Sequence, residues 1–352
     1  MENTADSLYR AAVWGLQAGV VSAALNWLGQ ALRVPLAGDF GTCAAFLVGA
    51  VAGAAAILLL DTVKISTKDR AVFVTGCDSG FGHAMALRLA DMGFVVFAGC
   101  LFAEGQGAKQ LKNTGRSNIH VIQLDVTSDE QVKRARDYVT EHLPLRGLWG
   151  ILNNAGLATF GYVEWVPIST YKKVMDVNMW GMIRMIQAFL PLLRKSKGRV
   201  VNIASALARQ SSPNRSTYGI SKYGVEALSD CLRFEMRRFG VTVAIIEPGN
   251  FGSATGIFTP ESIRRDAEAL WKNIPPDVQQ VYTKEFFDGI IENMIAYAGK
   301  SKSDMTSVLD AMTLALIHRY PHPRYQPMEP YFKIRTWIST HLPEWIHEAL
   351  YI

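Results

Sequence analysis

The sequence predicts an α/β fold built on a doubly wound parallel sheet, preceded by hydrophobic helices. Short apolar runs rich in β-branched residues alternate with amphipathic stretches, which is typical of strands connected by helices. A glycine-rich turn follows the first of these runs, where a strand would lead into a helix. Two long uncharged runs precede the first predicted strand, and these predict the hydrophobic helices.

The two uncharged runs differ in polarity. Ala11–Leu32 lies between two arginines and contains several amides, whereas Gly41–Leu60 has no Asn or Gln and ends at Asp61. Because about 20 apolar residues cross a bilayer core as a helix, the second run is the better candidate for a span. The first is either a weaker span or an interfacial helix, and burial of both in a soluble core is the alternative. We expect residues 1–67 to form a membrane anchor of one or two helices.

Residues 68–328 are predicted to form the nucleotide-binding domain. Strands in such a sheet place ligands at their carboxyl ends. An amphipathic insertion over 258–300 is expected to cover the substrate, and residues 329–352 form an amphipathic tail that suits either a membrane interface or a neighbouring subunit. The strand candidates are Ala71–Gly76, Phe94–Cys100, Val121–Leu124, Trp149–Leu152, Arg199–Ile203, Val241–Ile246 and a last one near Tyr325.

Charge and cysteine content exclude several classes of protein. The chain has 36 Lys and Arg against 31 Asp and Glu, a net charge of +5 without a long basic block, so no nucleic-acid partner is expected. The four cysteines lie far apart and form no C-x-x-C pair, so we expect neither a metal site nor a disulfide framework.

The glycine turn has a physical role that only glycine fulfils well. Gly76, Gly80 and Gly82 would let backbone N–H groups and the start of the next helix approach a pyrophosphate. Glycines in a strand–helix turn also occur without any ligand. Their position in the first unit of an α/β run favours the dinucleotide interpretation.

Several motifs in register resemble the classical short-chain dehydrogenase/reductase family. They are Thr75-Gly76-x-x-x-Gly80-x-Gly82, Asn153-Asn154-Ala155-Gly156, Asn178, Ser205 and Tyr218-x-x-x-Lys222. Other segments resemble the D-β-hydroxybutyrate dehydrogenase branch, with the membrane-bound 17β-hydroxysteroid and retinol dehydrogenases next. The resemblance implies a Rossmann-type fold and a cofactor site that comprises Thr75, Gly76, Asp78, Ser79, Gly80, Phe81, Gly82, Asp125, Asn153, Ala155, Gly156, Tyr218, Lys222, Pro248 and Gly249.

The predicted catalytic group is a phenol with a lysine neighbour. Tyr218 and Lys222 lie four residues apart on an expected helix and share one face. A nearby cation favours phenolate, so we expect the pKa of Tyr218 to fall and the phenol to act as general base in alcohol oxidation. Ser205 would stabilise the reacting oxygen, and the resemblance implies that Asn178 holds a water behind Lys222.

The expected cofactor is NAD. The 2′-phosphate of NADP requires a basic residue near the end of the second strand, but Cys100-Leu101-Phe102-Ala103 contains none, and Asp78 would repel a phosphate. The acidic residue expected there for the ribose hydroxyls is also missing. Asp125 is either an adenine contact, by resemblance, or the cap of a turn.

Arg215, three residues before Tyr218, is the candidate that distinguishes substrates. It would bind a substrate carboxylate, as in oxidation of (R)-3-hydroxybutyrate to acetoacetate, or it is a solvated loop arginine. A hydroxysteroid or retinol dehydrogenase and a non-catalytic NAD-binding scaffold are the alternatives. We expect a small-molecule or lipid-like substrate, a phospholipid membrane of the endoplasmic reticulum or the mitochondrial inner membrane, and a homo-oligomer, dimeric or tetrameric.

Overall fold

The computed structural model describes residues 2–31 and 39–351. Leu32, at the end of the first predicted hydrophobic run, and Ile352, at the end of the predicted tail, lie outside the described residues. The chain divides into two compact units. The first comprises Met1–Ser66 and Ile317–Pro321, and the second comprises Thr67–Leu316 and His322–Ile352.

The first unit contains two long helices, α1 (Glu2–Ala31) and α2 (Asp39–Leu60), which pack against each other. Small residues allow the close approach, since a Cβ atom on Gly15 would lie only 2.6 Å from the carbonyl oxygen of Ala50. Large apolar side chains on both helices are exposed, among them Trp14, Leu16, Val20, Val21, Leu25, Leu47, Val48, Val51 and Leu59.

Within the described part of the chain, no helix has both the length and the apolar character that a membrane crossing requires. The prediction that Gly41–Leu60 spans a bilayer is therefore not supported.

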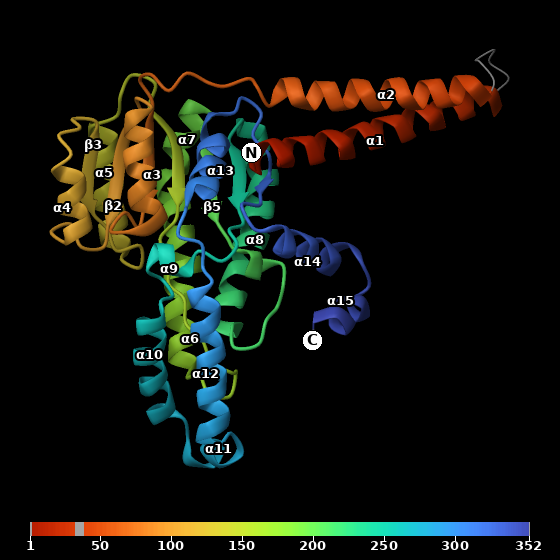
Figure 1. Cartoon of the computed structure of the whole chain (residues 1–352). Coiled ribbons are helices and arrows are strands. Elements are labelled where there is room, and N and C mark those ends of the chain that lie inside the picture. The colour runs from red at the N-terminus through yellow and green to blue at the C-terminus, as the bar shows by residue number, and fades with distance from the viewer. Residues whose placement is uncertain (1, 32–38, 352) are drawn as a thin grey trace. The chain divides into compact units, whose positions relative to one another are not determined.

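The second unit is built on a parallel sheet with strand order β3-β2-β1-β4-β5-β6-β7, which confirms the predicted fold class (Figure 1). Chain progression reverses direction between β1 and β4, and the carboxyl ends of such neighbouring strands leave room for a ligand. The strands are β1 (Ala71–Thr75), β2 (Val95–Cys100), β3 (Ile119–Gln123), β4 (Leu148–Asn153), β5 (Arg199–Ile203), β6 (Thr242–Ile246) and β7 (Arg324–Tyr325).

Helices cover both faces of this sheet and bury its strands. On one face Phe73, Phe97 and Phe189 lie in a continuous apolar core with side chains of α5, α7 and α8. On the other face α3 contacts α13 through Met85 and Thr313. The helices of this core are α3 (Gly80–Asp91), α4 (Gln106–Lys112), α5 (Asp129–Glu141), α6 (Ile168–Met175), the π-helix η1 (Asp176–Gly181), α7 (Met182–Ser196), the 3₁₀ turns η2 (Ala206–Ala208) and η3 (Arg237–Phe239), α8 (Ser216–Met236) and α13 (Thr306–Ile317).

The insertion after β6 forms a helical subdomain with its own core. Helices α10 and α12 lie side by side and extend away from the sheet (Figure 1). A capping box between Thr259 and Ser262 begins α10. In the core of the subdomain, Trp165 and Phe287 pack with ring centroids 5.2 Å apart. The helices are α9 (Gly252–Thr255), α10 (Pro260–Asn273), α11 (Pro276–Val281) and α12 (Lys284–Gly299).

The tail forms α14 (Pro330–His341) and α15 (Glu344–Tyr351) and packs on its own chain. The side-chain amide of Gln210 donates to the carbonyl oxygen of Phe332 at 3.0 Å, and the Ser339 hydroxyl donates to the carbonyl oxygen of Arg209 at 2.9 Å. These bonds hold α14 against the loop that follows Ser205.

Candidate active site

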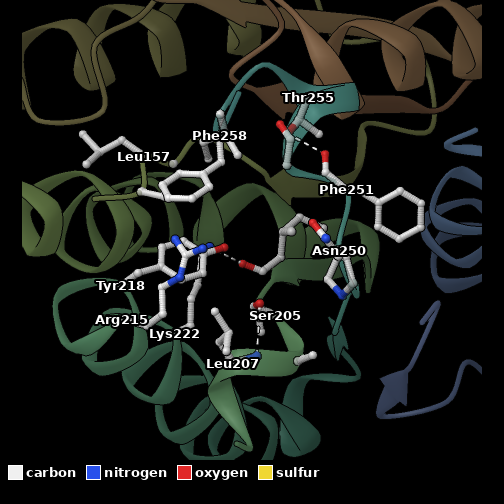
Figure 2. A pocket seen from close by; sticks show the side chains of 18 of the residues that line it. Leu157, Ser205, Leu207, Arg215, Tyr218, Lys222, Asn250, Phe251, Thr255 and Phe258 are labelled. Carbon is white, nitrogen blue, oxygen red and sulfur yellow. Dashed lines mark hydrogen bonds between the residues drawn. The ribbon is translucent and has the colours of Figure 1, made fainter. Parts of the chain in front are cut away.

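A cavity of about 750 Å³ opens at the carboxyl ends of β1, β4, β5 and β6 (Figure 2). Segments of α9, α12 and α14 complete its walls. It brings together most residues that the sequence predicted for the site, namely Gly76, Asp78, Ser79, Gly80, Phe81, Asp125, Ala155, Gly156, Ser205, Arg215, Tyr218, Lys222, Pro248 and Gly249.

Four predicted site residues do not line this cavity, namely Thr75, Gly82, Asn153 and Asn178. The Thr75 hydroxyl accepts the backbone N–H groups of Asn154 and Ala155 at 3.0 and 2.9 Å. Asn153 donates to Asn202 on the next strand, and a Cβ on Gly82 would collide with the carbonyl oxygen of Gly76. Their hydrogen bonds and close packing support the segments that line the cavity, and direct cofactor contacts of Thr75, Gly82 and Asn153 stay a prediction.

The glycine turn fits a pyrophosphate. Gly76 and Gly80 have φ angles of +70° and +57°, a region that side chains disfavour. A Cβ on Gly80 would lie 3.0 Å from the Cα of Thr255, so this close approach of the glycine loop to α9 favours glycine. Helix α3 begins at this point after Ser79, and its first N–H groups favour an anion.

Asp78 supplies the acidic group that the sequence lacked after the second strand. Its two carboxylate oxygens accept the backbone N–H groups of Leu101 and Phe102 at 2.8 and 2.9 Å. The glycine loop therefore places a negative charge at the end of β2, beside Leu101, which also lines the cavity. This position favours ribose hydroxyls and disfavours a 2′-phosphate, in agreement with the preference for NAD argued from charge.

Asp125 fulfils the capping role that the sequence left open. One carboxylate oxygen accepts the backbone N–H and the hydroxyl of Thr127, at 2.9 and 2.8 Å. The residue also lines the cavity, so an adenine contact stays a prediction.

Burial raises the pKa of Tyr218, contrary to the expectation that its lysine neighbour lowers it. A hydrogen bond with Ser205 and the charge of Arg215 act in the opposite direction but do not outweigh the loss of hydration. Ser205 is itself oriented by the backbone N–H of Leu207, which donates to its hydroxyl at 3.2 Å (Figure 2).

Lys222 shares a face of α8 with Tyr218, as predicted, but its ammonium lies 5.6 Å from the centre of the Tyr218 ring. It donates to the carbonyl oxygen of Ile203 at 2.8 Å. Because the side chain is buried without a carboxylate, its pKa falls to about 8. The electrostatic effect of Lys222 on the phenol is thus weaker than its sequence spacing suggested.

Asn178 lies in η1 and joins two parts of the site. Its amide nitrogen donates to the carbonyl oxygen of Leu157 at 2.9 Å and to the Ser221 hydroxyl at 3.0 Å, while its amide oxygen accepts the Leu157 N–H at 2.9 Å. Asn178 therefore fixes the loop after β4 to α8, and a water-holding role stays a prediction.

Arg215 contributes a cation to the substrate end of the cavity. Its guanidinium lies 4.0 Å from the centre of the Phe258 ring, close to Tyr218 (Figure 2). Burial lowers its pKa to about 10, which still leaves it charged at neutral pH. No carboxylate of the described residues forms an ion pair with it.

The sequence predicted that the 258–300 insertion covers the substrate, but it did not identify which of its residues line the cavity or that the tail contributes to it. Helix α12 contributes Ile290, Asn293, Met294 and Tyr297, and α14 contributes Phe332 and Arg335. Spacings of three and four along α12 indicate one helical face, which was the only signal available for that set. No local pattern marks the two residues of α14.

The family is decided by two comparisons. Residues 70–262 match the family model described as short chain dehydrogenase. The mitochondrial D-beta-hydroxybutyrate dehydrogenase of Rattus norvegicus is 46% identical over 287 residues, 80% of this chain and 84% of the relative. The chain belongs to the short-chain dehydrogenase family. Retinol dehydrogenase 7 of Mus musculus is 42% identical and covers 73% of this chain and 80% of its own length.

Solved structures agree on the fold. A short-chain dehydrogenase from Burkholderia phymatum in complex with NAD is 21% identical, with a TM-score of 0.62 over 78% of this chain and 94% of the other. One from Streptomyces avermitilis is 25% identical, with a TM-score of 0.57 over 73% and 88%. The family and the D-beta-hydroxybutyrate dehydrogenase relative make the chain an NAD-dependent oxidoreductase that acts on CH–OH groups.

Proposed function

We propose that the protein oxidises (R)-3-hydroxybutyrate reversibly to acetoacetate and binds the substrate carboxylate at Arg215. The observation that supports this most directly is a charged guanidinium, close to the candidate base Tyr218, that pairs with no carboxylate among the described residues. A buried cation of this kind gains a charge-assisted hydrogen bond from an anionic ligand. The 46% identity to a D-beta-hydroxybutyrate dehydrogenase also supports the proposal.

Tyr218 and Ser205 have different roles in the proton transfer. Tyr218 takes the proton of the substrate hydroxyl, and Ser205, hydrogen bonded to the phenol, donates to the reacting oxygen. The glycine loop and Asp78 would hold NAD, which would accept the hydride and, when oxidised, would add a positive charge that favours the phenolate form of Tyr218. Lys222 and Asn178 hold α8 against the ends of β4 and β5 and keep Tyr218 in place.

A lipid-like alcohol is the second candidate substrate, either the secondary alcohol of a hydroxysteroid or the primary alcohol of retinol. Apolar side chains line the same end of the cavity, including Phe258, Ile290, Met294 and Phe332. These suit a steroid or a retinoid, and relatives named for both substrates are at least 40% identical.

A substrate panel with two Arg215 variants separates these candidates. NADH formation would be measured in detergent with added phospholipid for (R)-3-hydroxybutyrate, a 17β-hydroxysteroid and retinol. If the carboxylate binds Arg215, Arg215→Ala lowers kcat/KM for hydroxybutyrate by about a hundredfold and Arg215→Lys retains part of it. Activity on the steroid or retinol alone, unaffected by either substitution, would reject the hydroxybutyrate assignment.

The proposal includes membrane association and self-association. The outward apolar side chains of α1 and α2 support attachment to a phospholipid membrane, either of the endoplasmic reticulum or of the mitochondrial inner membrane. Exposed apolar residues on α8, which are Ile220, Tyr223 and Phe234, support a homo-oligomer. Sedimentation of Phe234→Glu against the parent chain tests the second point, and an unchanged mass would reject this interface.

A further inference from the structure

Helix α8 carries a row of four ionisable groups at intervals of four residues. Tyr218 and Lys222 line the cavity, and Glu226 and Asp230 continue the row beyond it. Glu226 is 5% exposed, and Glu247, which directly follows β6, is completely buried. The proposed catalytic chemistry uses neither glutamate.

The two glutamates share one arginine. The Arg324 guanidinium lies 3.0 Å from one carboxylate oxygen of Glu226 and 3.4 Å from Oε1 of Glu247. Glu247 also accepts from the side-chain amide of Gln326 at 2.6 Å. Asp230 pairs with Arg324 and with Arg233, and this outer carboxylate is therefore compensated separately.

Two carboxylate oxygens of this cluster have no hydrogen-bond donor among the described residues. They are the remaining oxygen of Glu226 and Oε1 of Glu247, and both are buried. Two buried carboxylates beside a single shared guanidinium carry excess negative charge, whereas one proton between them leaves the group close to neutral. Burial and the nearby Glu247 raise the pKa of Glu226 to about 8, in agreement with this geometry.

We propose that Glu226 and Glu247 share one proton, and that the resulting O–H···O bond fixes α8, with Tyr218 and Lys222, against the Pro248–Gly249 segment of the cofactor site. Both glutamates are positioning residues, because neither touches the cavity. The inference concerns cofactor binding and does not depend on which alcohol is the substrate.

The backbone around Glu247 transmits its position to the cofactor site. Its N–H donates to the carbonyl oxygen of Tyr325 at 2.8 Å. The next residue, Pro248, accepts the N–H of Ala206 at 2.9 Å, directly beside Ser205. A shift of Glu247 away from α8 would therefore move the wall that Pro248 and Gly249 form.

Two nearby groups titrate with opposite signs, which allows them to be separated. The pKa of Glu226 is raised from 4.5 to about 8, so the folded state becomes less stable, relative to the unfolded chain, as pH rises through that interval. The pKa of Lys222 is lowered from 10.5 to about 8, so its contribution changes only above that pH and in the stabilising direction. The other charged groups around Glu226 are Arg324 from β7, Asp230 and Arg233 from α8, and Arg209.

Glu226→Gln tests the shared proton, since the amide donates a hydrogen bond without titrating. The equilibrium constant for unfolding would be measured for the parent chain and for Glu226→Gln. We expect the parent value divided by the variant value to increase between pH 5 and 8, by up to about tenfold per pH unit. The dissociation constant of NADH would be measured by fluorescence titration at pH 7 and at pH 9. The pH 9 value divided by the pH 7 value should be at least about threefold larger in the parent chain than in Glu226→Gln.

Glu235→Gln is the matched control, because it makes the same change on an exposed residue of α8. It should behave as the parent chain in both measurements. Glu247→Gln removes the other partner and should reproduce Glu226→Gln, which also covers the case in which the first variant does not fold. If Glu226→Gln or Glu247→Gln keeps the parent's pH dependence of stability and of NADH affinity, the shared proton is rejected.

Discussion

The two ends of the cavity are built in different ways. The cofactor end is formed mainly by backbone at the ends of β1 and β2. Its two specific requirements are a glycine at position 76, where φ is positive, and the carboxylate of Asp78. At the substrate end the contacts are side chains from the β5 loop, α12 and α14, such as Arg215, Tyr297 and Phe332. A cofactor common to many enzymes is thus held by local geometry, and substrate choice depends on segments distant in sequence.

This difference predicts how substitutions at each end behave. Changes at the substrate end should alter which alcohol is used while NADH binding stays the same. Changes at the cofactor end should alter nucleotide choice for every alcohol. Tyr218 lies between the two ends and should affect both only through the chemical step.

Tyr218→Phe is expected to have the largest effect. Removing the phenol oxygen removes the general base, so kcat should fall by about 10³-fold for every substrate. The NADH dissociation constant, measured by fluorescence, should stay within about twofold, because the ring remains in place. Retention of full turnover would show that another group accepts the proton.

Arg215→Ala is expected to have the next largest effect and to be confined to anionic substrates. Loss of the buried cation should lower kcat/KM for the hydroxy acid by about a hundredfold, mainly through KM. A neutral secondary alcohol of similar size serves as the control. An equal loss for acid and neutral alcohol would mean that Arg215 only supports the fold.

Asp78→Asn tests the other end of the cavity. Without the negative charge at the end of β2, the preference for NAD over NADP, as a ratio of kcat/KM values, should fall by about tenfold. The single amide oxygen can accept from only one of the N–H groups of Leu101 and Phe102, so part of the effect should be a loss common to both nucleotides, which the ratio cancels. An unchanged preference would contradict the role assigned to the charge.

The effect of Lys222→Met on stability is expected to be the smallest of the four. The pKa of buried Lys222 is lowered to about 8, so keeping it charged below that pH costs folding free energy. The variant without cofactor should therefore unfold at a higher temperature than the parent at pH 7. The difference should shrink as pH rises from 8 toward 10.5, by on the order of 1 kcal/mol per pH unit.

The sequence predicted the regions where function depends on local pattern. The strand–glycine turn–helix unit and the spacing of Tyr218 and Lys222 on one helix follow from short-range periodicity and turn chemistry, and the structure confirms this geometry. The pKa of Tyr218 was predicted in the wrong direction because burial depends on tertiary packing.

Contacts between distant segments could not be predicted. Asp78 reaches the end of β2 across a hydrogen-bonded turn, and Arg335 enters the cavity from the tail. Neither position follows from local spacing, since each depends on how separate elements pack. For the same reason no sequence pattern indicates that Glu226 lies against Glu247.

The most direct test of the account compares (R)-3-hydroxybutyrate with its methyl ester in the parent chain and in Arg215→Ala. The ester keeps the alcohol and the carbon skeleton but removes the negative charge. We predict that the parent prefers the acid by about a hundredfold in kcat/KM, and that Arg215→Ala abolishes this preference. A parent chain that oxidises the ester as well as the acid would contradict carboxylate recognition by Arg215.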